Sequence, residues 1–232
     1  MAKEIAYGRS PVHSYYPIYL DLNGRHCIVI GEGPEAERAA QELLESRATV
    51  TVIGSKTTPA IKDLANRQIL EWKSREYRSG DLKNAFLVIS ENNQTNTYEP
   101  VVSDAKSHNI LINVINVRHV SNFISPHITR SGEVAFAIST TWLSPALATH
   151  LKEKLEESPI MRWAEMGEML HEVDLELNQK QIYPHPDRWR ECLDEELLDL
   201  FESGYIDKAK ERLTNMLSKQ PANTQTKQTP TT

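Results

Sequence analysis

Short apolar runs alternate with amphipathic stretches along the first half of the chain. Runs of four or five apolar, mostly β-branched residues predict strands, and apolar residues spaced three or four apart predict helices. The predicted strands are His26–Ile30, Thr49–Ile53, Ile69–Lys73, Phe86–Ser90 and Leu111–Ile115. The predicted helices between them are Glu35–Ser46, Pro59–Asn66 and Thr95–Ser107. Strands joined through helices of this length indicate right-handed crossovers, so this half is predicted to be a Rossmann-like α/β domain with a parallel sheet.

The pattern changes after Asn116. A loop through Phe123 and Pro126 is expected to lead to a strand at Glu133–Thr140 and a helix at Pro145–Glu157. From there the periodicity is only helical, over about residues 160–178, 187–200 and 203–218. Residues 219–232 are polar and interrupted by proline, so they carry too few apolar groups to order themselves.

Composition narrows the class of protein. The chain has 232 residues, of which 39% are hydrophobic and 25% charged, as is ordinary for a globular protein. A net charge of −6 argues against non-specific nucleic-acid binding. Two cysteines are too few for a disulfide framework, the apolar runs are too short to span a bilayer, and no signal peptide opens the sequence. We therefore expect a cytoplasmic protein without a nucleic-acid or membrane partner.

A glycine turn follows the first predicted strand. Gly31-Glu32-Gly33-Pro34-Glu35-Ala36 has the strand–turn–helix setting in which backbone amides and the helix N-terminus attract a phosphate. Two interpretations stay open, a dinucleotide site or a purely structural turn. The candidate residues for contact with NAD, in the turn and after the second strand, are Gly31, Gly33, Pro34, Glu35, Ser55 and Lys56.

Three glutamates bear on that choice. Glu32 and Glu35 lie in the turn, and Glu91 follows the fourth predicted strand. A carboxylate about 6 Å from a pyrophosphate costs roughly 3 kcal/mol at an effective dielectric near 20. If these side chains instead point to solvent, screening removes most of that cost. The first alternative predicts that NAD binding is weakened or lost.

Further short segments follow the turn in a fixed order, namely Asn113–Asn116, Phe123–Pro126, Ala137–Thr140 and Ser144–Ala148. With the turn, they make residues 15–158 resemble the precorrin-2 dehydrogenase/sirohydrochlorin ferrochelatase family, the N-terminal part of siroheme synthase. The resemblance implies NAD-dependent oxidation of precorrin-2 to sirohydrochlorin, with insertion of ferrous iron as a second activity. The alternative is a relative that binds or delivers a tetrapyrrole, or only inserts ferrous or cobalt ion.

The proposed catalytic position departs from the family. The family places an aspartate, thought to serve proton transfer and metal insertion, where this chain has Asn116. An amide can neither take up a proton nor attract a cation by charge. His119 and His127 flank Phe123–Pro126 and could assist deprotonation or bind metal, or be ordinary surface residues. The catalytic candidates are Asn116, His119 and His127, with no certain metal ligand.

The predicted substrate loop departs as well. Thr141 and Trp142 stand where the family has two glycines. Trp142 could stack on a macrocycle, fill vacated cofactor space or pack in a dimer interface. Arg118 is the preferred partner for the carboxylates of a tetrapyrrole. The substrate-binding candidates are Arg118, Ser139, Thr140 and Trp142.

The resemblance also implies a homodimer. The expected divisions are a loose segment 1–14, a dinucleotide-binding domain 15–115, a dimerisation and substrate-loop segment 116–150, a helical domain 151–218 and a disordered tail 219–232.

Overall fold

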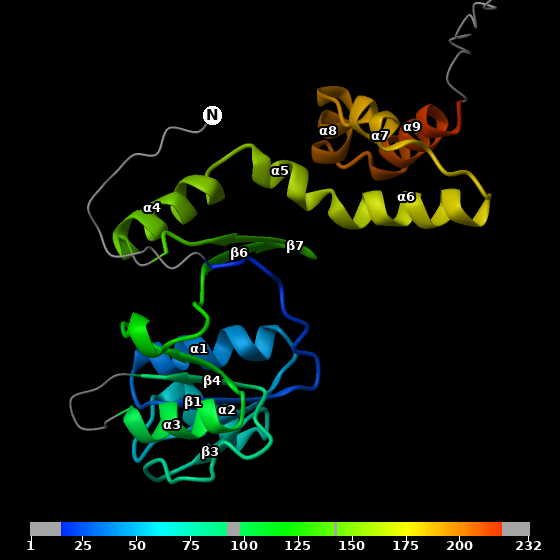
Figure 1. The fold of residues 1–232 in the computed structure, drawn as a ribbon. Helices are drawn as coiled ribbons and strands as arrows, with labels where there is room; N and C mark the ends of the chain where they lie inside the picture. The colour runs from blue at the N-terminus through cyan, green and yellow to red at the C-terminus, as the bar shows by residue number, and fades with distance from the viewer. Residues whose placement is uncertain (1–14, 92–97, 142, 220–232) are drawn as a thin grey trace, which may run out of the picture. The chain divides into compact units, whose positions relative to one another are not determined.

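The computed structural model describes residues 15–91, 98–141 and 143–219 (Figure 1). The chain divides into two compact units, Met1–Ser125 and Pro126–Thr232. Each unit is described below by itself.

The first unit is built on a parallel sheet whose five strands are ordered β3-β2-β1-β4-β5. The strands are β1 His26–Ile30, β2 Thr49–Ile53, β3 Glu71–Lys73, β4 Leu87–Ser90 and β5 Leu111–Val114. The helices are α1 Pro34–Glu45, α2 Pro59–Asn66 and α3 Glu99–Ser107. These elements confirm the predicted Rossmann-like fold, with bounds that differ by a few residues; the predicted start of the third helix, Thr95, lies outside the described residues.

Helices cover both faces of this sheet because successive side chains of a strand point to opposite sides. In β1, Cys27 and Val29 pack with α1 and α2, whereas Ile28 and Ile30 pack with α3. All four side chains are buried. A strand that is apolar on both faces is what a doubly wound parallel sheet requires. The central strand β1 therefore ends at Ile30, in the middle of the edge of the sheet that the carboxyl ends of the strands form.

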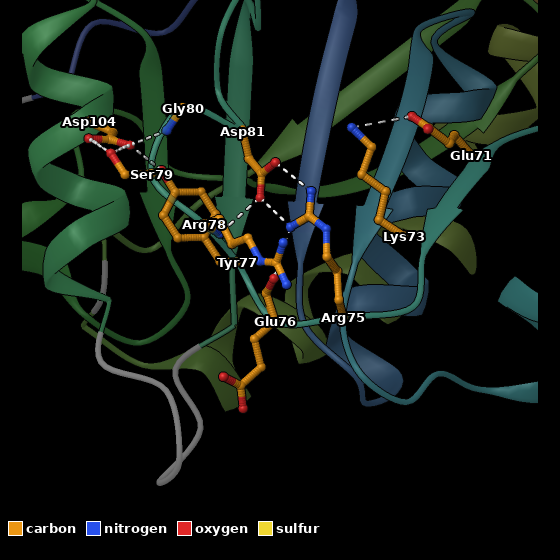
Figure 2. A network of polar contacts seen from close by, with 10 residues as sticks. All are labelled: Glu71, Lys73, Arg75, Glu76, Tyr77, Arg78, Ser79, Gly80, Asp81 and Asp104. Atoms are coloured by element: carbon orange, nitrogen blue, oxygen red, sulfur yellow. Dashed lines mark hydrogen bonds and ion pairs between the residues drawn. The ribbon is translucent and has the colours of Figure 1, made fainter.

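The long connection between β3 and β4 is held by ion pairs and hydrogen bonds instead of regular structure (Figure 2). The Arg75 guanidinium donates two hydrogen bonds of 2.7 Å to the Asp81 carboxylate. The Tyr77 hydroxyl donates to Asp104 of α3 at 2.5 Å, and the Gly80 amide donates to the same carboxylate at 3.0 Å. These contacts fasten the connection to itself and to the helix beside β5.

Replacing Asp81 by asparagine is expected to lower the free energy of unfolding by about 2 kcal/mol at pH 7, because a two-pronged, charge-assisted contact to a half-buried guanidinium is lost. Arg75 holds the pKa of Asp81 below its usual range. The contribution is therefore complete above the unfolded pKa near 4 and is lost as pH falls through the lower folded pKa. Urea unfolding at pH 7 and pH 3 checks this: the difference from wild type should shrink at pH 3.

Asp63→Asn is the matched control. Its partner Arg67 lies 3.3 Å away and both side chains are more than half exposed, so the change should cost less than about 0.5 kcal/mol. An Asp81→Asn effect no larger than that of Asp63→Asn would contradict the assigned role of the Arg75–Asp81 pair.

The second unit begins with an antiparallel hairpin of β6 His127–Ser131 and β7 Val134–Ile138. Helices follow in the order α4 Pro145–Glu156, α5 Ile160–Glu165, α6 Gly167–Gln179, α7 Pro186–Cys192, α8 Glu195–Glu202 and α9 Ile206–Ser218. The hairpin packs with α4 and α5, and residues of α6–α9 form a core of their own. In the described part of the chain, none of the helices is long and apolar enough to cross a membrane.

Three predictions for this unit differ from the structure. The helix expected over about residues 187–200 is divided into α7 and α8, because Asp194 caps the N-terminus of α8 by accepting a hydrogen bond from the Leu197 amide. The strand β6 lies where the sequence reasoning placed only a loop. The helix expected over about residues 160–178 is interrupted at Met166, which is fully buried. Gly167 begins the next helix, and a Cβ atom there would lie 2.9 Å from a methyl group of Val134, so the hairpin approaches the helix junction where glycine leaves room.

Candidate functional site

The glycine turn joins β1 to α1 at the carboxyl edge of the sheet. The Gly31 amide donates to the Ile53 carbonyl of β2 at 3.0 Å, and the Glu91 amide donates to the Ile30 carbonyl at 2.7 Å. The strand order reverses between β1 and β4, so the turn lies at the switch point where doubly wound sheets bind ligands. The fold therefore places the turn where a dinucleotide site is expected.

A carboxylate of the chain itself occupies the anion position of this turn. Glu91 Oε2 accepts hydrogen bonds from the amides of Glu32 at 2.8 Å and Gly33 at 3.1 Å. A Cβ atom on Gly31 would lie 2.6 Å from Glu91 Oε2, and one on Gly33 would lie 2.7 Å from Oε1. The two glycines thus make room for the carboxyl group of Glu91.

The other two glutamates behave differently from each other. Glu32 Oε1 accepts a hydrogen bond of 3.1 Å from the Lys56 amide, which ties the turn to the connection after β2. Glu35 pairs with Arg38 at 2.8 Å on the surface of α1, with half of each side chain exposed. The two alternatives for these side chains are repulsion of a bound pyrophosphate and exposure to solvent. The carboxylates of Glu91 and Glu32 do not simply point to solvent, because Glu91 accepts hydrogen bonds from two backbone amides and Glu32 accepts one.

The remaining candidates for cofactor contact lie around the same edge. Pro34 is the first residue of α1 and is exposed, as are Ser55 and Lys56 after β2. Paired amides at a helix N-terminus, without side chains in front of them, have the chemistry of a phosphate site. The pyrophosphate of a dinucleotide does not fit as the turn stands, since the Glu91 carboxylate holds both amides.

Asn116 lies at the carboxyl end of β5, on the same edge of the sheet as the glycine turn. It occupies the third position of a turn closed by a hydrogen bond of 2.9 Å from the Val117 amide to the Val114 carbonyl. Its φ is 63° and its side chain is exposed. This backbone conformation suits asparagine and aspartate better than most residues. An aspartate at this position could take up a proton at the edge of the sheet, whereas the amide of Asn116 can only form hydrogen bonds.

The residues after Asn116 are fixed against the free edge of β5. Arg118 and His119 belong to the short 3-10 helix η1 Arg118–Val120; Arg118 is half-buried and His119 exposed. The Ser121 hydroxyl accepts a hydrogen bond from the Val114 amide at 2.9 Å, and Asn122 Oδ1 accepts one from the Ile112 amide at 2.8 Å. Sequence reasoning missed these two positioning residues, although serine and asparagine after a strand are common partners for backbone amides.

The other predicted site residues belong to the second unit. His127 is half-buried at the start of β6. The Thr140 hydroxyl donates to the Ser144 carbonyl at 2.9 Å, and the Ser139 hydroxyl accepts from the Thr141 amide at 3.1 Å. Both hydroxyl groups therefore hydrogen-bond to the backbone of the segment that precedes α4. Trp142 lies outside the described residues, among which no group of three or more histidine, cysteine, aspartate or glutamate side chains is arranged to hold a metal ion.

Thr141 has a φ of 49°, a conformation that is unfavourable for a β-branched residue. Thr141→Asn is expected to raise the free energy of unfolding by about 1 kcal/mol, because asparagine tolerates this region. Chemical denaturation measures the change. Thr141→Val, which keeps the β-branch, is the control and should give no stabilisation. Equal stability of the asparagine variant and wild type would contradict strain at this position.

Comparisons with known proteins also indicate a dinucleotide-binding fold. A family model described as that of NAD(P)-binding proteins matches residues 18–127. Siroheme synthase 1 of Klebsiella pneumoniae is 33% identical over 142 residues, which are 61% of this chain and 30% of the relative. Siroheme synthase of Mannheimia succiniciproducens is 28% identical over 210 residues, 89% of this chain and 44% of the relative. The chain thus spans less than half the length of these curated relatives.

A solved structure entitled SirC, precorrin-2 dehydrogenase has the same fold, with a TM-score of 0.64 and 24% identity. It covers 87% of this chain, and this chain covers 98% of it. The likeness extends beyond the sheet and includes most of the second unit. The chain is therefore similar in fold to this precorrin-2 dehydrogenase and similar in sequence to part of the siroheme synthases, with an NAD(P)-binding family model over residues 18–127.

Proposed function

We propose that this protein acts in siroheme biosynthesis, as a precorrin-2 dehydrogenase-like enzyme that oxidises precorrin-2 to sirohydrochlorin with NAD(P). The observation that carries the proposal is the strand–glycine-turn–helix at the switch point of the parallel sheet, where a dinucleotide is expected once the Glu91 carboxylate leaves the two amides. The names of the relatives supply the substrate class. A bound dinucleotide would supply the hydride acceptor.

The substrate is proposed to lie at the carboxyl edge of β5. Arg118 would pair there with a carboxylate of the tetrapyrrole, since guanidinium groups bind carboxylates in two-pronged fashion. His119, exposed one residue further on, would accept the proton that leaves as the substrate loses a hydride. Asn116 would orient the substrate by hydrogen bonding only. Within the second unit, His127, Ser139, Thr140 and Trp142 are proposed separately as substrate-binding residues.

A second candidate function is tetrapyrrole binding or metal insertion without dehydrogenation. It is favoured by the amide at Asn116 and by the Glu91 carboxylate in the glycine turn. Ferrous or cobalt ion would then be the second substrate, and His119 or His127 would take the pyrrole protons.

A homodimer formed through about residues 113–150, in the cytoplasm, completes the proposal. Leu143 before α4 and Leu147 on it are 67% and 48% exposed, which supports an apolar interface on this segment. Light scattering tests it, and a monomer at micromolar concentration would contradict it.

An anaerobic assay of the purified protein with precorrin-2 and NAD or NADP tests the activity, by following sirohydrochlorin absorbance against a control without protein. Turnover that depends on the dinucleotide supports the dehydrogenase. Tight binding of precorrin-2 or sirohydrochlorin without turnover supports the second candidate. If the protein shows no turnover and no binding of either tetrapyrrole, both candidate functions are overturned.

A further inference from the structure

The register of the sheet determines where the Glu91 side chain can reach. Ser90, the last residue of β4, lies opposite Ile30, the last residue of β1. Glu91 therefore follows at the level of Gly31, and its own amide is fixed by the Ile30 carbonyl. From this position its side chain extends over the turn, and a carboxylate oxygen meets two amides.

The contact between the Glu91 carboxylate and the two amides resembles that of a bound anion at a helix N-terminus. Hydrogen bonds from backbone amides to a charged oxygen are roughly twice as strong as those between neutral groups, and the N-terminus of α1 adds a favourable partial charge. A Cβ atom added at Gly31 or Gly33 would lie within 2.7 Å of a Glu91 carboxyl oxygen. The turn is thus filled by an anion that belongs to the chain.

We propose that the Glu91 carboxylate is an intramolecular competitor for the pyrophosphate site of the glycine turn. A dinucleotide and Glu91 claim the same two amides, so a dinucleotide binds only when the Glu91 side chain leaves them. The inference rests on the proposed function in that the competing ligand is NAD(P). Glu91 thereby sets the affinity of the protein for its dinucleotide, and a small residue at this position gives a tighter site.

The test is the binding of NAD, NADP and ADP to the chain of residues 1–232 by calorimetry, with no tetrapyrrole present. Glu91→Ser is expected to tighten binding of all three by ten-fold or more. In wild type a ligand must first break the hydrogen bonds between the amides and the charged Glu91 carboxylate, and the variant removes this cost. Glu91→Gln should fall between, since its carbonyl oxygen can still accept from the amides but carries no charge.

Glu37→Gln is the matched control. Glu37 lies in the first turn of the same helix, and its carboxylate accepts a hydrogen bond from Gln41 instead of from the glycine turn. The variant removes one negative charge near the helix N-terminus and should change the affinities less than two-fold. A change as large as that of Glu91→Ser would overturn competition in favour of a general electrostatic effect.

Thermal unfolding gives a second readout. Without ligand, Glu91→Ser should melt at a lower temperature than wild type, because two amides lose their partner; with NAD its melting temperature should rise more than that of wild type. Equal affinities of wild type and Glu91→Ser, or no binding by either, overturn the inference. The proposed function is tested separately, since an enzyme that turns over precorrin-2 but binds dinucleotide equally with and without Glu91 refutes only the competition.

Discussion

Replacing Gly54 by alanine is expected to lower the free energy of unfolding by about 3 kcal/mol. A Cβ atom at this position would lie 2.5 Å from the Gly31 carbonyl oxygen, 3.0 Å from that of Lys56 and 3.1 Å from Glu32 Cγ. The closest atom is backbone, and its strand is held on both sides in the sheet. The methyl group can therefore be admitted only if the ends of β1 and β2 move apart, which also distorts the glycine turn.

Urea unfolding of the chain of residues 1–232 measures this loss of stability. Ser55→Ala is the matched control, because the neighbouring side chain is exposed, and it should stay within about 0.5 kcal/mol of wild type. Gly54→Ala with the stability of wild type would mean that the two strand ends can separate freely, contrary to the close approach of the Gly31 carbonyl.

The sheet could be predicted from sequence because each of its elements carries a local signal. The mostly apolar and β-branched residues of β1 and β2, and the prolines at the first positions of α1 and α2, mark strands and helices without reference to the rest of the chain. The strand β6 was missed because it mixes polar and apolar residues and its one buried side chain, Thr129, is polar. The two-residue loop that follows it, which begins with Gly132 at a φ of 54°, is a hairpin signal that could have found it.

The arrangement of the site was less accessible to sequence reasoning. The three glutamates could be recognised as charges near a phosphate turn, but the sign of their effect in the free protein depends on register between strands about sixty residues apart. Once Ser90 is paired with Ile30, Glu91 satisfies the turn that it was expected to disturb. Such non-local placement is not encoded in any local pattern, whereas the position of Gly31 after a strand is.

Backbone geometry and side-chain chemistry are separable at Asn116. Its turn requires a residue that accepts a φ of 63°, and both asparagine and aspartate do so. The turn alone therefore does not determine which of the two stands there. Exchange of the amide for a carboxylate should leave the turn, the 3-10 helix η1 and the edge of β5 as they are, with a change in stability of less than about 0.5 kcal/mol.

Asn116→Asp is accordingly expected to raise the rate of precorrin-2 oxidation by about 100-fold, because a positioned group that can take up a proton contributes about 10²–10⁴-fold to such reactions. The rate is measured anaerobically at saturating NAD or NADP, so that the contact between Glu91 and the glycine turn does not limit it. The gain should appear in kcat, since the amide and the carboxylate fill the same space.

Asn109→Asp provides the control for this substitution. Asn109 is also exposed, with a φ of 53°, and it precedes β5, at the opposite end of the strand from Asn116. The same chemical change there should leave the rate unaltered. If Asn116→Asp folds as wild type and gives no gain over Asn109→Asp, position 116 has no part in proton transfer. That result would leave His119, the proton acceptor proposed for the wild-type protein, as the group that takes up the proton in both variants.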